Sequence, residues 1–210
     1  MAAVDTKICY IVGAAEFCRG FLPEEGDLVI AADGGYDRLL QMGIEPQIVM
    51  GDLDSVRSSI PDSTELLRFK VEKDETDTYL AFLEGYRRGY RSFRILGGCG
   101  GRADHTMANY QLLLKARRMG ARASLVSDYD ESLVIENEAI VLDRGEYQGV
   151  SLFAFGKNAR NVNISGLKYP ANGIDLSVDF PLGVSNSFVE NEAAISVEDG
   201  ALLVMLRYKK

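Results

Sequence analysis

The chain has 210 residues, of which 47% are hydrophobic and 26% are charged. These proportions exclude wholesale disorder and a fibrous repeat, and the length predicts one or two globular domains. The net charge of −8 argues against a nucleic-acid partner, because neutralising a phosphate backbone requires clustered cations. A small anionic ligand remains compatible with this charge, since a few local donors can override it.

The cysteine and hydropathy patterns indicate a cytoplasmic protein. Cys9, Cys18 and Cys99 show no metal-ligand spacing, and their odd number does not suit a disulfide framework. The first residues do not resemble a signal peptide, and no stretch approaches the roughly 18 apolar residues of a membrane span. We therefore expect a reducing compartment and no membrane partner.

Residues 7–128 alternate short apolar runs with amphipathic stretches. The apolar runs predict buried strands at Ile8–Val12, Leu28–Ala32, Ile48–Met50, Phe93–Leu96 and Leu125–Ser127. The amphipathic stretches, each followed by a glycine, predict helices at Tyr36–Met42, Thr76–Arg88 and Asp104–Met119. This alternation predicts a Rossmann-like, doubly wound parallel sheet with helices on both faces.

The pattern changes after residue 130, where short alternating runs follow one another without a helix. These runs are Ala139–Leu142, Val150–Phe155, Ile174–Val178, Ala193–Val197 and Leu202–Leu206. Turn signals separate them at Arg144-Gly145, Asn172-Gly173 and Asp199-Gly200. The sequence thus predicts an α/β domain over residues 1–130 and a β-sandwich over residues 131–210.

Four acidic residues are predicted to meet at one edge of the sheet. Asp52 and Asp54 follow a strand, and an extended chain would put both carboxylates on one side, about 6–7 Å apart at the backbone. Asp33 ends another strand, and Asp77 opens a helix. Taken alone, each fits a solvated turn or a helix cap. Together their repulsion requires a cation, and Mg²⁺ favours such oxygen ligands beside substrate phosphates.

A glycine-rich turn, Gly97–Gly101, joins a strand to a helix and is followed by Arg102. Backbone N–H groups of glycines, a helix N-terminus and a forked guanidinium all suit a phosphate group. His105, the single histidine, either bonds locally at the helix start or transfers a proton. In the β region, Gly183–Phe188 forms either a hairpin turn or a surface for an organic cation or aromatic ring.

Taken in order, these segments resemble the signatures of the thiamine pyrophosphokinases over nearly the whole chain. The matching segments are Ala32–Gly35 with Gly43–Pro46, Gly51–Ser55, Lys73–Asp77, Gly100–Asn109, Gly166–Pro170 and Ser185-Asn186. A single D-x-D motif is weak, but six ordered matches are specific. The resemblance implies a homodimer that transfers a diphosphoryl group from ATP to thiamine and releases AMP.

The resemblance also implies roles for individual residues. Asp52, Asp54 and Asp77 would be the catalytic residues that hold Mg²⁺ on the ATP phosphates. The ATP pocket would be lined by Asp33, Gly34, Lys73, Arg102, Asp104 and His105. Thiamine would lie between the two domains near the subunit boundary, against Ser185 and Asn186. Because the chain has no tryptophan, Phe188 or Tyr169 would supply the aromatic contact.

Two other functions are weighed against this one. Asp52–Val56 satisfies the D-x-D-x-[TV] pattern of haloacid-dehalogenase-like phosphatases, in which the first aspartate is a nucleophile. That pattern normally follows the first strand of its domain, whereas here it follows about the third. A non-catalytic nucleotide or thiamine sensor is the other alternative, because fold alone does not decide function.

Overall fold

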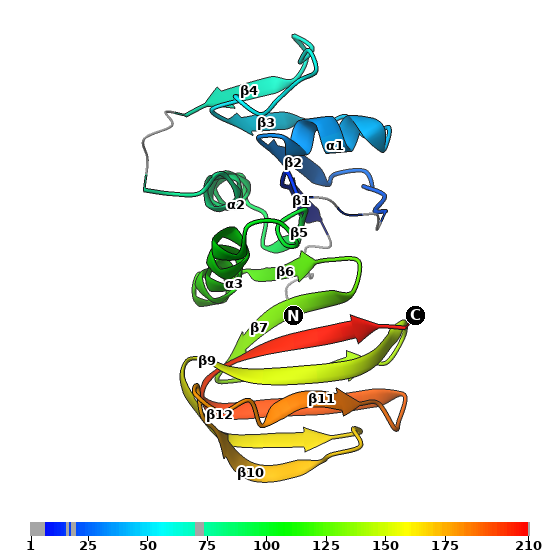
Figure 1. Ribbon diagram of the computed structural model, residues 1–210, viewed down its shortest axis with the longest axis vertical. Coiled ribbons are helices and arrows are strands. Elements are labelled where there is room, and N and C mark those ends of the chain that lie inside the picture. Colours follow the sequence, from blue (N-terminus) through cyan, green and yellow to red (C-terminus); the bar gives the residue numbers. More distant parts are fainter. Residues whose placement is uncertain (1–6, 16, 18–19, 70–73, 210) are drawn as a thin grey trace. The chain divides into compact units, whose positions relative to one another are not determined.

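The structure, a computed structural model, describes residues 7–15, 17, 20–69 and 74–209. The chain divides into two compact units (Figure 1). One unit comprises residues up to Leu112 together with Met119–Asp128, and the other comprises Leu113–Arg118 and Tyr129–Lys210. Within the described chain, no helix has the length and apolar character needed to cross a membrane.

The first unit contains a parallel sheet. Its elements are β1 (Ile8–Val12), β2 (Leu28–Ala32), α1 (Gly35–Gln41), β3 (Ile48–Gly51), β4 (Glu65–Arg68), α2 (Asp77–Arg87), β5 (Ser92–Leu96), the first part of α3 (Ala103–Arg118) and β6 (Arg122–Val126). The strands lie in the order β6-β5-β1-β2-β3-β4, and each neighbouring pair is parallel. The predicted parallel α/β sheet is thereby confirmed. No sequence pattern had predicted β4, a short edge strand whose residues are largely exposed.

Helices cover both faces of this sheet. Tyr36 of α1 packs in one buried cluster with Tyr10 of β1. Gly85 of α2 lies so close to Cys9 of β1 that a Cβ on this glycine would stand 2.7 Å from the sulfur. Because consecutive residues of a strand point to opposite faces, α1 and α2 pack on opposite sides of β1. This is the doubly wound arrangement that the alternation predicts.

The second unit is antiparallel throughout its assigned strand pairs, which confirms an all-β C-terminal region. Its strands are β7 (Asp130–Glu136), β8 (Ala139–Asp143), β9 (Tyr147–Ser165), β10 (Ala171–Leu176), β11 (Gly183–Ser187) and β12 (Glu192–Tyr208). The first part of β12 pairs with β8 and the second part with β7, while β9 pairs along nearly all of it. Side chains from both parts of these long strands bury one core, including Val162, Ile195 and Leu202.

The turn signals of this unit had different outcomes. Arg144-Gly145 does separate β8 from β9, as predicted. Asp199-Gly200 does not end a strand, because it lies within β12 at a shift of register, where Gly200 has φ +114°. Asn172-Gly173 likewise lies within β10. A glycine at a positive φ within a strand is typical of a bulge, which bends the strand without ending it.

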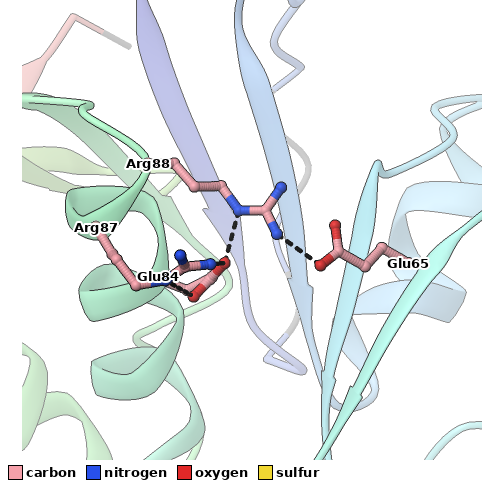
Figure 2. A network of polar contacts seen from close by, with 4 residues as sticks. All are labelled: Glu65, Glu84, Arg87 and Arg88. Atoms are coloured by element: carbon pink, nitrogen blue, oxygen red, sulfur yellow. Dashed lines mark hydrogen bonds and ion pairs between the residues drawn. The ribbon is translucent and has the colours of Figure 1, made fainter.

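A network of arginines and glutamates ties α2 to the edge of the sheet (Figure 2). Glu84 on α2 accepts hydrogen bonds from Arg87 and from Arg88, both at 2.6 Å. Arg88 also donates to Glu65 of β4 at 2.6 Å. The side chain of Glu84 is only 12% exposed, and its bonds to the arginines hold its pKa below the ordinary value. The C-terminal end of α2 is therefore anchored to β4.

We predict that Glu84→Gln lowers the free energy of unfolding by about 1–3 kcal/mol at pH 7. A depressed carboxyl pKa stabilises the fold above the unfolded-state pKa, and this stabilisation disappears as the pH falls through the folded-state value. The difference between wild type and variant should therefore decrease as the pH falls from 7 to 3. Urea unfolding at both pH values measures it, with exposed Glu25→Gln as the control. An equal loss at both pH values would show that the charge of Glu84 is not its source.

Candidate active site

The topology of the sheet indicates where a ligand binds. The chain runs from β1 through β2 and β3 to β4 on one side, and through β5 to β6 on the other. The strand order therefore reverses between β1 and β5, and open α/β sheets bind ligands at such a point, beyond the carboxyl ends of the strands. The loops after β1 and β5 begin with Gly13 and Gly97, so these two loops flank the expected crevice.

These two loops approach each other backbone to backbone. Gly13 N–H donates to Leu96 O at 2.8 Å, and Ala15 N–H donates to Gly97 O at 3.1 Å. A Cβ on Gly13 would stand 2.6 Å from Gly97 O, and Gly97 itself has φ +61°. Only glycine fits both positions without strain. Because neither glycine has a side chain, the crevice is bordered by backbone groups at these two positions.

A cavity of about 500 Å³ opens at this place. Its volume lies within the usual range for small-molecule sites. The lining residues come from the ends of β1, β2 and β5 and from the starts of α2 and α3: Gly13, Ala14, Ala15, Ala32, Asp33, Ser55, Thr76, Asp77, Thr78, Gly97, Gly98, Cys99, Gly101, Arg102, His105, Thr106 and Asn109. Of the predicted nucleotide-pocket and metal residues, this cavity brings together Asp33, Asp77, Arg102 and His105.

Asp33 is held tightly at the acidic side of the cavity. Its backbone has φ +47°, and its N–H donates to Met50 O at 2.8 Å. Its Oδ1 is buried and has no hydrogen-bond partner among the described residues. A Cβ on Gly51 would stand 1.7 Å from this oxygen, so the glycine makes room for the carboxylate.

The charged side chains that affect the pKa of Asp33 are acidic. The pKa of Asp33 is raised to about 7, mainly by burial and in addition by a hydrogen bond with the Asp77 side chain and by the charges of Asp77 and Asp52. A backbone hydrogen bond from Leu53 opposes this shift. Three predicted acidic residues therefore lie within electrostatic reach of one another at the carboxyl edge of the sheet.

These acids fit a divalent cation that is shared with a phosphate ligand. An unpartnered buried carboxylate oxygen and a set of oxygen donors suit Mg²⁺, which usually takes one or two carboxylates and completes its shell with water and phosphate. In the part of the chain that the structure describes, no three or more His, Cys, Asp or Glu side chains form a ready metal cluster. The N–H of Asp54 donates to Asp52 Oδ1 at 3.1 Å, and neither residue lines the cavity.

The opposite side of the cavity is the glycine-rich turn and the start of α3. Arg102 lines the cavity and pairs with Asp104, with Nη2 to Oδ2 at 2.6 Å. This pairing lowers the pKa of Asp104, whose side chain does not line the cavity. Asp104 therefore contacts Arg102, and Arg102 is the residue of this pair that lines the cavity. Gly34 lines a neighbouring cavity, and Lys73 lies outside the described residues.

Several residues of the cavity were not predicted from the sequence. Asn109 of α3 is 4% exposed, and its Nδ2 donates to Gly98 O at 2.7 Å, so it holds the glycine-rich turn in place. Thr76 caps α2 by accepting from Tyr79 N–H at 3.2 Å. Asn109 and Thr76 lie within the matching segments Gly100–Asn109 and Lys73–Asp77, although the resemblance gave them no role. For the loop after β1, the available signal was Gly13-Ala14-Ala15, a run of small residues directly after the first strand.

In the second unit, the predicted thiamine-binding residues differ in accessibility. Ser185 is exposed, and its backbone has φ +64° at a shift of register in β11. Asn186 is 7% exposed and Phe188 belongs to the buried core, so the ring of Phe188 presents no free face. Tyr169, the other aromatic candidate, is 60% exposed.

An open α/β sheet with a cavity at its switch point, followed by an antiparallel β region, is an arrangement typical of a nucleotide-binding protein with a second domain. Residues 22–125 match the model of the thiamin pyrophosphokinase catalytic domain, and residues 137–202 match the model of the thiamin pyrophosphokinase vitamin B1 binding domain. The chain belongs to the thiamin pyrophosphokinase family. This membership confirms the resemblance carried by the sequence motifs.

Individual relatives agree. The thiamine pyrophosphokinase of Bacillus subtilis is 28% identical over 190 residues, covering 88% of each chain. The crystal structure of thiamine pyrophosphokinase from Bacillus subtilis superposes with a TM-score of 0.87 at 24% identity, covering 97% of this chain and 100% of that one. The structure from Geobacillus thermodenitrificans gives 0.84 at 25% identity, covering 97% and 98%.

We predict that the two described cysteines differ in reactivity and that ATP protects one of them. Burial raises the pKa of Cys9, whereas half-buried Cys99 lines the cavity. Iodoacetamide at pH 8 should label Cys99 and leave Cys9 unmodified, and ATP at ten times its Kd should slow the labelling of Cys99 about tenfold. Peptide mass spectrometry measures both sites. Labelling in urea is the control, and a Cys99 rate unaffected by ATP would contradict a nucleotide in this cavity.

Proposed function

We propose that the chain is a thiamine diphosphokinase, which transfers the diphosphoryl group of ATP to the hydroxyl of thiamine and releases AMP. Its family membership extends over both units, and this is the observation that carries the proposal. The cavity at the switch point supports the use of ATP, because it combines glycine N–H groups, a helix N-terminus and an arginine with carboxylates.

In this reaction the thiamine hydroxyl oxygen forms a bond to the β-phosphorus of ATP. The bond between the β-phosphorus and the oxygen that bridges to the α-phosphorus breaks, and AMP leaves with that oxygen. Phosphoryl transfer asks the protein mainly to align these oxygens and to stabilise the spreading negative charge. When bound, Mg²⁺ would neutralise charge on the phosphates.

The residues of the chain then have distinct proposed roles. Asp33 and Asp77 line the cavity and bind the cation. Asp52 and Asp54 add negative charge at the same edge of the sheet. Arg102 and the N–H groups of the glycine-rich turn bind phosphate oxygens, and Asp104 orients Arg102. His105 lies beside the nucleotide. On the second unit, Ser185 and the ring of Tyr169 offer a hydroxyl and an aromatic face for thiamine, an aromatic cation.

We also propose that the protein acts as a homodimer in the cytoplasm, with the thiamine site near the subunit interface. Two-fold symmetric dimers are the commonest soluble oligomers. Large apolar side chains exposed together on the second unit support an interface there: Val178, Phe180 and Leu182 are 56%, 63% and 57% exposed. Multi-angle light scattering at micromolar concentration would measure the mass, and a monomer would refute this part of the proposal.

The decisive experiment incubates the protein with ATP, Mg²⁺ and thiamine. AMP and thiamine diphosphate should appear in equal amounts, and both should depend on thiamine. Phosphate release without thiamine, with a trapped aspartyl-phosphate, would favour the phosphatase alternative instead. The D-x-D segment follows β3 rather than β1, which does not suit that alternative. Binding of both ligands without turnover would favour a sensor.

We predict that Asp52→Asn, Asp54→Asn and Asp77→Asn each lower kcat by about 10²–10³-fold, because each removes a negative charge that would attract the cation. Circular dichroism should show an intact fold. Exposed Asp62→Asn, in the turn before β4, is the matched control and should retain full activity. Near-normal turnover of any of the three variants would remove that residue from the proposed metal site.

A further inference from the structure

The side chain of Asn186 makes three hydrogen bonds within the protein. It is 7% exposed on β11. Its Oδ1 accepts from the N–H groups of Tyr169 and of Ser187, both at 3.0 Å, and its Nδ2 donates to the carbonyl of Tyr169 at 2.8 Å. An asparagine amide has two acceptor positions and two donor hydrogens, so these bonds leave one N–H, on a side chain that is almost buried. Most of the hydrogen-bonding capacity of Asn186 is therefore directed at the protein itself.

Two of these bonds grip one residue on both sides of its α-carbon. Asn186 satisfies both the N–H and the carbonyl of Tyr169, as a neighbouring strand would. The loop of Tyr169 is fixed elsewhere by Lys168 N–H, which donates to Ser187 O at 2.9 Å, and by buried Leu167. The loop backbone is thus held firmly, while the ring of Tyr169 stays 60% exposed.

The exposed ring already interacts with a cation. The ammonium of Lys168 lies 5.4 Å from the centroid of the Tyr169 ring, within the range of a cation–π interaction. Ser185, with the exposed hydroxyl, directly precedes Asn186, and its N–H donates to Ser151 Oγ at 3.1 Å. Asn186 therefore links the strand that carries the hydroxyl to the loop that carries the ring.

We infer that Asn186 is a positioning residue, which holds the backbone of Tyr169 against the strand that carries Ser185, so that the ring of Tyr169 receives the aromatic cation of thiamine. This inference rests on the proposed function and deepens it, because it separates the residue that contacts thiamine from the one that acts through it. Loss of the clamp leaves the ring present but misplaced. Thiamine binding should then weaken, while ATP binding in the other unit is unaffected.

Steady-state kinetics of Asn186→Ala, Tyr169→Ala and the double variant test this inference. Each single variant should raise KM for thiamine about tenfold and leave KM for ATP unchanged. The double variant should match Tyr169→Ala, because interacting residues are non-additive and the clamp has nothing left to position. Tyr169→Phe, which keeps the ring, should raise KM for thiamine less than Tyr169→Ala does.

A clamp elsewhere in the same unit provides the control. Asn163 Oδ1 accepts from Gly173 N–H at 2.9 Å, and its Nδ2 donates to Asn161 O at 3.2 Å. Asn163→Ala should lower the thermal midpoint about as much as Asn186→Ala does, without raising KM for thiamine. A rise of KM in both variants would mean that general loosening, not positioning, is responsible, and would overturn the inference.

A binding measurement independent of turnover uses the absence of tryptophan from the chain. Tyr169→Trp introduces a single tryptophan, whose emission thiamine should quench, and adding Asn186→Asp should raise the Kd from this titration several-fold. Asp keeps the two acceptor positions but turns a carboxylate towards the carbonyl of Tyr169. An unchanged Kd, or additive effects in the double Ala variant, would overturn the inference. A wild-type protein that makes no AMP would refute the proposed function instead.

Discussion

The structure depends on negative charges that are brought together at one edge of a parallel sheet. Asp33 follows β2, Asp52 follows β3 and Asp77 opens α2, and the effect of the last two on Asp33 shows that they share one neighbourhood. Like charges that lie close together repel one another, and burial raises the free-energy cost of this repulsion. In the proposed function, a cation that also binds phosphates would offset this repulsion.

Steric constraint on the backbone shapes the rest of the cavity. The paired loops after β1 and β5 exclude any side chain at Gly13 and Gly97. Gly35, at the start of α1, is equally confined, since a Cβ there would stand 1.9 Å from Val12 O. The helix and both loops can therefore come close to the strand ends, and backbone N–H groups remain available to an anion.

Much of this arrangement could be predicted from the sequence, because periodicity and glycine stops are local signals. Apart from β4, the strands of the sheet were predicted within a few residues of their observed bounds. The helices were predicted equally closely. β4 was missed, since Glu65–Arg68 is short and lacks alternation. The long strand β12 was read as two pieces, because a glycine inside a bent strand resembles a turn, and only the Val150–Phe155 part of β9 was predicted.

The site was harder to predict where a role depends on contacts across the fold. The acidic residues could be foreseen from their positions after strands, yet the pairing of Asp104 with Arg102 and the bond from Asn109 to Gly98 could not. Asn186 is the clearest example, since its partner Tyr169 lies 17 residues away in the chain. A motif identifies such a residue as important but does not reveal whether it touches the ligand.

A crystal structure with Mg²⁺ and an ATP analogue that carries a methylene bridge between its α- and β-phosphorus atoms tests the central claim most directly. We expect the triphosphate to accept hydrogen bonds from the turn after β5, and the metal to join it to at least one of the four aspartates at the sheet edge. A nucleotide bound elsewhere, with those aspartates facing solvent and free of metal, would contradict the account.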